Sequence, residues 1–186
     1  MKHVAIFGMK FTRQSLDYVH QVHVECQKRG WNVVMEHDML NHLKSKYDFS
    51  LPCTTYATDQ DFKKGIDYMI CLGGDGSFLR AVRFVRDSGV PILGINTGRL
   101  GFLSNISKEA IGETFQLLED KKYEFQKRSL IRVRTQDELF GLENFALNEL
   151  TISKKDTSSM ITVHAKLDGK YLNSYWADGL IVSTPT

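Results

Sequence analysis

The sequence is short of the residues that cross-link proteins or anchor them in membranes. It contains three cysteines and no Cys-x-x-Cys pair, so we expect neither a disulfide framework nor a zinc site. No apolar run approaches the roughly 18 residues of a membrane span. The first residues also lack the long apolar run and cleavage site of a signal peptide. We therefore expect a soluble, cytoplasmic protein in which Cys26, Cys53 and Cys71 are buried free thiols.

An excess of charge of one sign is missing too. The chain has 24 basic and 22 acidic residues, a formal net charge of +2, which argues against nucleic acid or a membrane surface as a partner. The composition, with 42% hydrophobic and 25% charged residues, excludes disordered, collagen-like and coiled-coil proteins. The length of 186 residues predicts one large domain, or one domain with part of a second.

The first 120 residues or so alternate short apolar runs with amphipathic stretches. This alternation predicts an α/β fold with a doubly wound, mostly parallel sheet. The expected strands are residues 4–7, 32–36, 67–72 and 92–95, and the expected helices are residues 15–29, 77–86 and 107–121. Residues 38–61 contain Pro52 and show weak periodicity, and there we expect a short helix followed by a loop.

The pattern changes beyond about residue 123. Residues 131–135 and 161–167 alternate strictly between apolar and polar side chains, which is typical of antiparallel strands. A tight turn at 168–170 joins the second run to residues 171–175. We therefore expect an α/β domain over residues 1–122 and the first part of an all-β domain over 123–186.

The strongest local motif is the tetrapeptide Gly73, Gly74, Asp75 and Gly76, placed where a predicted strand ends and a helix begins. Glycines there allow a close approach to a phosphate, and the first amides of the helix favour an anion. A carboxylate in such a turn suits a group that accepts a proton from a hydroxyl or holds a metal ion beside phosphates. The alternative is a plain tight turn with Asp75 as the helix N-cap.

Other polar residues follow strands at the same predicted sheet edge. Arg80, Arg83 and Arg86 together are typical of a solvated helix face, but Arg80 lies near the proposed phosphates. Asn96 and Gly98 offer a turn with polar reach after the next strand. Phe102, taken alone, is more typical of a core residue than of a ring that stacks on a base.

A polar pair interrupts a later strand-like run. Asn148 and Glu149 lie within residues 146–152, where they must find partners or face solvent. A bound sugar hydroxyl and an exposed strand face explain the pair equally well.

Together the motifs resemble those of NAD kinases. The shared segments are residues 73–76, 96–103, 148–149 and 178–186, in the order and approximate spacing of that family. The resemblance implies ATP-dependent phosphorylation of the 2′-hydroxyl on the adenosine ribose of NAD, giving NADP. It also implies a divalent metal such as Mg²⁺ and a homodimer or homotetramer.

The resemblance assigns roles to individual residues as well. It implies that Asp75 accepts the proton, with Gly76 beside it on the phosphates and ribose. Further nucleotide-binding positions that it implies are Gly73, Gly74, Arg80, Asn96, Gly98, Phe102, Asn148, Glu149, Asp178 and Thr186. Among these, Asn148 and Glu149 would hold the adenosine half, Phe102 would pack near the adenine, Asp178 would approach the nicotinamide end, and Thr186 would edge the adenine pocket. The metal ligands are not identified.

Two departures from the family pattern affect these expectations. Trp176 stands where many members have arginine, so no phosphate or ribose contact is expected at that position. The sequence also ends before the Gly-Ser-Thr-Ala-Tyr segment and roughly a hundred further residues of the family. We expect such a chain to have exposed strand edges, poor solubility and a tendency to associate. A catalytically silent or incomplete nucleotide-binding fragment therefore stays as an alternative, followed by a lipid kinase of the diacylglycerol kinase type or a phosphofructokinase.

Overall fold

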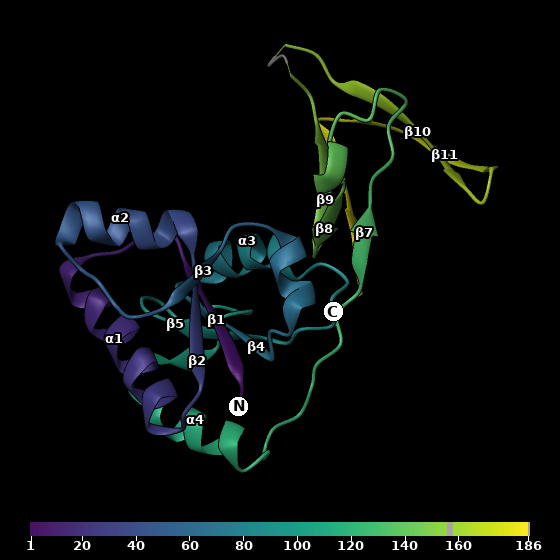
Figure 1. Ribbon diagram of the computed structural model, residues 1–186. Coiled ribbons are helices and arrows are strands. Elements are labelled where there is room, and N and C mark those ends of the chain that lie inside the picture. Colours follow the sequence, from purple (N-terminus) through teal and green to yellow (C-terminus); the bar gives the residue numbers. More distant parts are fainter. Residues whose placement is uncertain (156–157, 186) are drawn as a thin grey trace. The chain divides into compact units, whose positions relative to one another are not determined.

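The computed structural model describes residues 1–155 and 158–185 (Figure 1). The chain divides into two compact units, Met1–Phe125 and Gln126–Thr186. Within the described residues, no helix has both the length and the apolar character that crossing a bilayer requires.

The first unit is built on a six-stranded parallel sheet with the strand order β3-β2-β1-β4-β5-β6. Its strands are β1 (His3–Gly8), β2 (Asn32–Glu36), β3 (Thr54–Tyr56), β4 (Tyr68–Leu72), β5 (Ile92–Asn96) and β6 (Ile106–Ser107). Its helices are α1 (Arg13–Lys28), α2 (His37–Tyr47), α3 (Asp75–Val85) and α4 (Ile111–Glu119), and its 3₁₀ turns are η1 (Asp59–Lys64) and η2 (Lys108–Ala110). The mostly parallel α/β architecture expected from the sequence is confirmed.

Two hydrophobic clusters cover the two faces of this sheet. Successive residues of a strand point to opposite faces, so Ile6 of β1 packs in one cluster and Phe7 in the other. The first cluster includes apolar residues of α1, α2 and α4, and the second includes those of α3. Helices on both faces leave the carboxyl ends of the strands as the edge at which such sheets bind ligands.

Local contacts define the helix starts and one end of the sheet. Thr12 and Ser15 form a capping box at the start of α1, and the Glu36 carboxylate accepts hydrogen bonds from two amides in the first turn of α2. At the opposite end of the strands, the ammonium of Lys2 lies 4.6 Å from the ring centre of Trp31 and 4.7 Å from that of Tyr68.

Three sequence expectations for this unit need correction. Residues 54–56 form the edge strand β3 where a loop was expected, because three residues in a polar stretch show no recognisable period. The last helix begins at Ile111 and not at residue 107, since Ile106 and Ser107 pair with β5 and η2 precedes the helix. Helix α3 begins two residues earlier than expected, at Asp75.

The second unit consists of antiparallel strand pairs, as expected. Its elements are β7 (Leu130–Arg132), η3 (Gly141–Glu143), β8 (Phe145–Leu147), β9 (Glu149–Ser153), β10 (Ile161–Leu167), β11 (Lys170–Ala177) and β12 (Gly179–Ser183). In the described residues, β7 pairs with β8, β9 with β12 and β10 with β11. Asp168 and Gly169 have φ angles of 51° and 79°, as a tight hairpin turn requires.

Two expectations in this unit are corrected. Residues 146–152 do not form a single strand, because Asn148, with a φ of 76°, separates β8 from β9. The run 131–135 is likewise shorter as a strand, since β7 ends at Arg132.

Candidate active site

The Gly-Gly-Asp-Gly motif forms the turn between the buried strand β4 and helix α3. Gly73 has a φ of 141° and donates its N–H to the carbonyl of Ile95 at 3.0 Å, which ties the turn to the neighbouring strand β5. A Cβ atom at Gly73 would lie 2.9 Å from the Cβ of Ser77, so the turn needs glycine for space as well as for its backbone angle.

The first turn of α3 is shaped for an anion. Gly74 is the N-cap and provides no side chain to the first amides of the helix. Cβ atoms built on Gly74 and Gly76 would meet nothing within 4 Å, so there is open space beside the turn. Backbone amides at the start of an 11-residue helix, together with the helix dipole, favour a phosphate at this place.

Asp75 is not the N-cap, which corrects the plain-turn alternative. It is the first residue of α3, and its carboxylate reaches the loop that follows β5. Oδ2 accepts the N–H of Phe102 at 2.9 Å, while Oδ1 accepts those of Leu103 at 2.9 Å and Ser104 at 3.0 Å. A carboxylate with three backbone donors is held in one orientation.

These contacts also decide the charge of Asp75. Partial burial of the carboxyl raises its pKa, but the three backbone hydrogen bonds together outweigh this effect, and the pKa of Asp75 lies below its usual value. The group is therefore an anion at neutral pH. Each carboxylate oxygen can accept about two hydrogen bonds, so Oδ2 retains capacity for one more donor, such as a hydroxyl group.

The loop from 97 to 104 is organised by Asn96, the last residue of β5. The buried side chain donates from Nδ2 to the carbonyl oxygens of Arg99 at 2.6 Å and Ser104 at 3.2 Å, and its Oδ1 accepts the N–H of Gly98 at 2.7 Å. The expected turn at Asn96 and Gly98 is present. Both N–H bonds of the Asn96 amide are directed into the loop itself.

Gly101 has a role in this site that the sequence analysis missed. A Cβ atom at this position would lie 2.6 Å from Cγ of Asp75 and 2.9 Å from its Oδ2, well inside van der Waals contact. Glycine at 101 is therefore what allows the loop backbone to lie against the carboxylate. The available signal was a second glycine, three residues after Gly98, in the segment that follows a strand.

Phe102 projects from the loop. The ring is 93% exposed, so the interpretation of Phe102 as a core residue is wrong. Leu100, two residues earlier, is 69% exposed. An aromatic ring exposed beside an anchored carboxylate is available to stack on a flat ligand.

A hollow of about 350 Å³ lies at the carboxyl ends of β1 and β2, next to α3. Arg80, Arg83 and His42 contribute basic side chains to its wall, and Glu36 contributes a carboxylate that already caps α2. Its full lining is Phe7, Gly8, Met9, Phe11, Glu36, Asp38, Met39, His42, Arg80, Arg83 and Phe84. Arg80 lies in the second turn of α3, the helix that begins with Asp75, and its side chain lines this hollow.

The three arginines of α3 do not form one solvated face. Arg86 is the C-cap of the helix and pairs with Asp59 of η1 at 3.2 Å, with only 22% of its side chain exposed. Arg80 and Arg83 line the hollow and are exposed.

The expected site residues of the second unit lie at strand junctions. Asn148 joins β8 to β9 with an exposed side chain, and its carbonyl accepts the N–H of Thr184 at 2.7 Å. Glu149 is exposed and pairs with Ser183. Asp178, just before β12, forms an ion pair with Lys154 at 2.6 Å and is 77% exposed. Thr186 lies outside the described residues.

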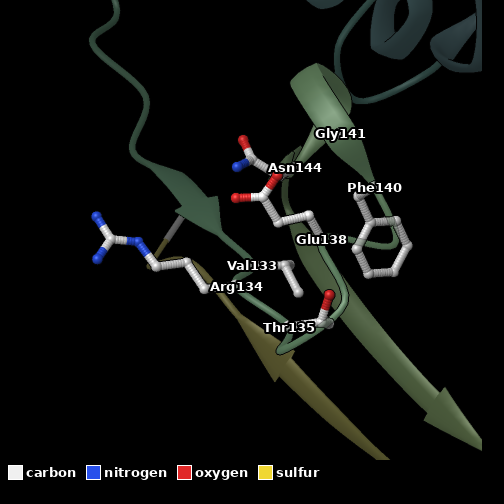
Figure 2. Close-up of a pocket in the computed structure, with 7 residues that line it drawn as sticks. All are labelled: Val133, Arg134, Thr135, Glu138, Phe140, Gly141 and Asn144. Carbon is white, nitrogen blue, oxygen red and sulfur yellow. The ribbon is translucent and has the colours of Figure 1, made fainter.

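A second hollow, of about 520 Å³, lies within the second unit (Figure 2). It is formed by the segment between β7 and β8 and is lined by Val133, Arg134, Thr135, Glu138, Phe140, Gly141 and Asn144. Figure 2 shows Arg134 extending away from the other labelled side chains. None of the residues expected to bind nucleotide lines this hollow.

The described residues contain no group of three or more His, Cys, Asp or Glu side chains that could hold a metal ion. Asp75 already accepts three backbone hydrogen bonds. Within the described residues, the side chains alone therefore do not form a metal-binding site.

Comparisons with known proteins give a consistent result. Residues 4–123 match the family described as the ATP-NAD kinase N-terminal domain, and residues 147–186 match the ATP-NAD kinase C-terminal domain. The NAD kinases of Flavobacterium psychrophilum and Cytophaga hutchinsonii each share 40% sequence identity with this chain, in alignments that cover 98% of it. The chain spans 63% and 62% of the lengths of these relatives.

Solved structures show the same fold. Yeast NADH kinase complexed with NADH superposes with a TM-score of 0.78 at 20% identity, covering 99% of this chain and 57% of that one. An NAD kinase from Archaeoglobus fulgidus in complex with ATP gives a TM-score of 0.66 at 21% identity, covering 97% of this chain and 60% of that one.

Proposed function

The chain belongs to the NAD kinase family, and from this premise we propose that it phosphorylates the 2′-hydroxyl on the adenosine ribose of NAD, using ATP, to give NADP. The observation that supports this best is Asp75, an anionic carboxylate anchored by three backbone amides beside an open helix N-terminus. The carboxylate that can accept a hydroxyl hydrogen therefore lies in the same helical turn as the backbone amides that can bind a phosphate.

Asp75 acts on the ribose hydroxyl. The free acceptor position of its Oδ2 takes the hydroxyl hydrogen and orients the oxygen for attack on the γ-phosphorus. The new O–P bond forms while the bond from the γ-phosphorus to the β,γ-bridging oxygen breaks, and ADP leaves with that electron pair. Because its pKa is lowered, Asp75 is a weak base, which suits a reaction whose transition state needs little proton abstraction. The proton passes to Asp75 and then to solvent.

The polyphosphate of ATP is the second ligand of this edge. We propose that it lies across the first turn of α3, with Arg80 reaching it from the hollow of about 350 Å³. The hollow takes its walls from β1, β2, α2 and α3, whereas the loop that holds Asp75 follows β5. The attacking ribose hydroxyl and the leaving β,γ-bridging oxygen would then lie on opposite sides of the γ-phosphorus, as an in-line transfer requires.

The expected Mg²⁺ does not fit a protein-built site in the described residues, which bring no cluster of ligands together. Mg²⁺ commonly keeps waters and substrate phosphates as its main ligands. We propose that it arrives on the ATP phosphates.

The remaining contacts to NAD are proposed from the family resemblance. Gly73, Gly74 and Gly76 would lie on the phosphates and ribose, with Asn96 and Gly98 shaping the adjoining loop. Asn148 and Glu149 would hold the adenosine, Phe102 would stack on the adenine, Asp178 would approach the nicotinamide, and Thr186 would edge the adenine pocket. The exposed ring of Phe102 and the exposed side chains of Asn148 and Glu149 support this assignment. A cytoplasmic homodimer or homotetramer completes the proposal.

The test is NADP formation from NAD, ATP and Mg²⁺ by this chain and two matched variants. Asp75→Asn keeps the shape of the side chain but removes its charge, and we expect it to abolish turnover. Asp87→Asn makes the same change at an exposed position beyond the other end of α3 and should keep the wild-type rate. NADP formation that survives Asp75→Asn unchanged would overturn the role of Asp75.

A nucleotide-binding protein without kinase activity is the second candidate, and the chain spans 63% of the length of one of its relatives. Calorimetric titration with NAD separates the two. NAD binding without NADP formation favours the second candidate, whereas the absence of both contradicts the kinase proposal for this chain.

A further inference from the structure

Asn96 has used its whole donor capacity within the protein. A side-chain amide has two N–H bonds, and those of Asn96 go to the carbonyls of Arg99 and Ser104. The side chain is buried, with only 3% exposed. A residue in this state has no hydrogen left to donate to a nucleotide, so its contribution must pass through the loop that it holds.

That loop provides the donors that hold Asp75. Ser104 connects the two groups directly, because its carbonyl accepts from Asn96 at 3.2 Å while its N–H donates to Asp75 at 3.0 Å. The N–H groups of Phe102 and Leu103 precede it in the chain and bind the same carboxylate. At the other end of the loop, the Asn96 side chain accepts the N–H of Gly98 at 2.7 Å.

We propose that Asn96 is a positioning residue, which fixes the orientation of the Asp75 carboxylate by holding the loop amides of residues 102–104 in place. The catalytic consequence rests on the proposed function, in which Asp75 accepts the hydroxyl of the substrate. The geometric consequence does not, since the hydrogen bonds form without any ligand. The two can therefore be tested separately.

The first test measures the ionisation of Asp75 in the ligand-free protein. The chain is labelled with ¹³C at aspartate carboxyls and titrated by NMR, and the Asp75 signal is identified by its loss in Asp75→Asn. Three weakened hydrogen bonds predict that Asn96→Ala raises the pKa of Asp75 toward that of an ordinary aspartate. Asn105→Ala, the same change at an exposed position next to the loop, should leave this pKa as in the wild type.

A second variant guards against a failure of Asn96→Ala to fold. Asn96→Ser keeps an oxygen that can accept the N–H of Gly98 but is too short to reach Ser104. We expect it to fold and to raise the pKa of Asp75 as well. A folded Asn96 variant with a wild-type Asp75 titration would overturn the proposal.

The second test measures the kinetics of NADP formation. Misplacing a reacting group by about 1 Å costs roughly 100-fold in rate, so we expect Asn96→Ser to lower kcat by roughly 10- to 100-fold while the KM for ATP stays near the wild-type value. A raised KM with an unchanged kcat would instead indicate that Asn96 acts on substrate binding and would contradict positioning. If the wild-type chain forms no NADP, the kinase proposal fails for this chain, and the titration still decides the role of Asn96.

Discussion

Replacing Gly101 by alanine tests the most restrictive contact of the site. The added methyl group would lie 2.6 Å from Cγ of Asp75 and closer still to its Oδ1, and van der Waals contact becomes ordinary at 3.4 Å, so a gap of at least about 0.8 Å has to open. The carboxylate cannot simply swing aside, because three backbone hydrogen bonds hold it. Either the loop or Asp75 must move, and their hydrogen bonds weaken in both cases.

The size of the effect follows from this displacement. Forcing one extra methyl group into a packed site costs about 1–3 kcal/mol of unfolding free energy. A displacement close to 1 Å at a reacting group lowers the rate by roughly 100-fold. We therefore expect Gly101→Ala to melt several degrees below the wild type and to form NADP roughly 100 times more slowly.

The assay pairs thermal denaturation with NADP formation and uses Gly112→Ala as its control. Gly112 lies in helix α4, and a Cβ atom there would meet nothing within 4 Å. The same substitution at that position should raise stability, by up to about 1 kcal/mol, because alanine favours helix. It should leave the rate unchanged.

A Gly101→Ala protein with the melting temperature and the rate of the wild type would contradict this prediction. That result would mean that the loop backbone yields without cost, so that Asp75 is not held as tightly as its hydrogen bonds indicate. A loss of stability as large in Gly112→Ala would show that the effect is not specific to the site.

Three further predictions concern charge and burial. Partial burial raises the pKa of Asp75, but its three backbone hydrogen bonds lower this pKa by more, so the net shift is downward. These bonds therefore stabilise the fold above the unfolded-state pKa and cease to do so as the pH falls through the folded-state pKa. Urea denaturation should show a wild-type advantage over Asp75→Asn that is constant above about pH 5 and shrinks below about pH 4, and a constant advantage down to pH 2 would contradict this. Burial raises the pKa of Cys26 and Cys71 to about 12, so iodoacetamide at pH 8 should modify the half-buried Cys53 first, and peptide mass spectrometry that finds the three modified equally fast would contradict this. Lys2→Ala should lower the unfolding free energy by about 1–2 kcal/mol, because the ammonium lies over a tryptophan and a tyrosine ring; equal urea midpoints would show that these contacts contribute nothing.

Elements with a strong period were predictable from the sequence, and those whose pairing decides their form were not. Strand 32–36 is found with the expected bounds because three consecutive apolar residues, 33–35, form its centre. Strand β3 was missed because its three residues become a strand only by pairing with β2. Asn148 separates two strands because its φ angle is positive. Asparagine tolerates such an angle more readily than most residues, but the sequence alone does not show that it is adopted here.

The candidate site divides in the same way. The position of Asp75 between a strand and a helix could be predicted from the glycines around it, since these restrict the backbone locally. Its partners could not, because the amides of residues 102–104 are 27 to 29 positions away and carry no side-chain signature. The residue pattern alone favoured a core position for the exposed Phe102, since an aromatic residue after an apolar strand is ordinarily buried, whereas the family resemblance implied a ring near the adenine.

The strand order of the first unit affects how the chain can fold during synthesis. β1 is made first, but it lies in the middle of the sheet, and its residue Val4 pairs with Tyr68 of β4, which is made 64 residues later. At roughly 5–20 residues per second, a ribosome needs about 3–13 s to cover that distance. Throughout that interval the backbone edge of β1 that pairs with β4 in the folded sheet has no partner strand. One edge of this central strand can therefore pair with β4 only after residues 68–72 have been synthesised, shortly before Asp75 of the active site.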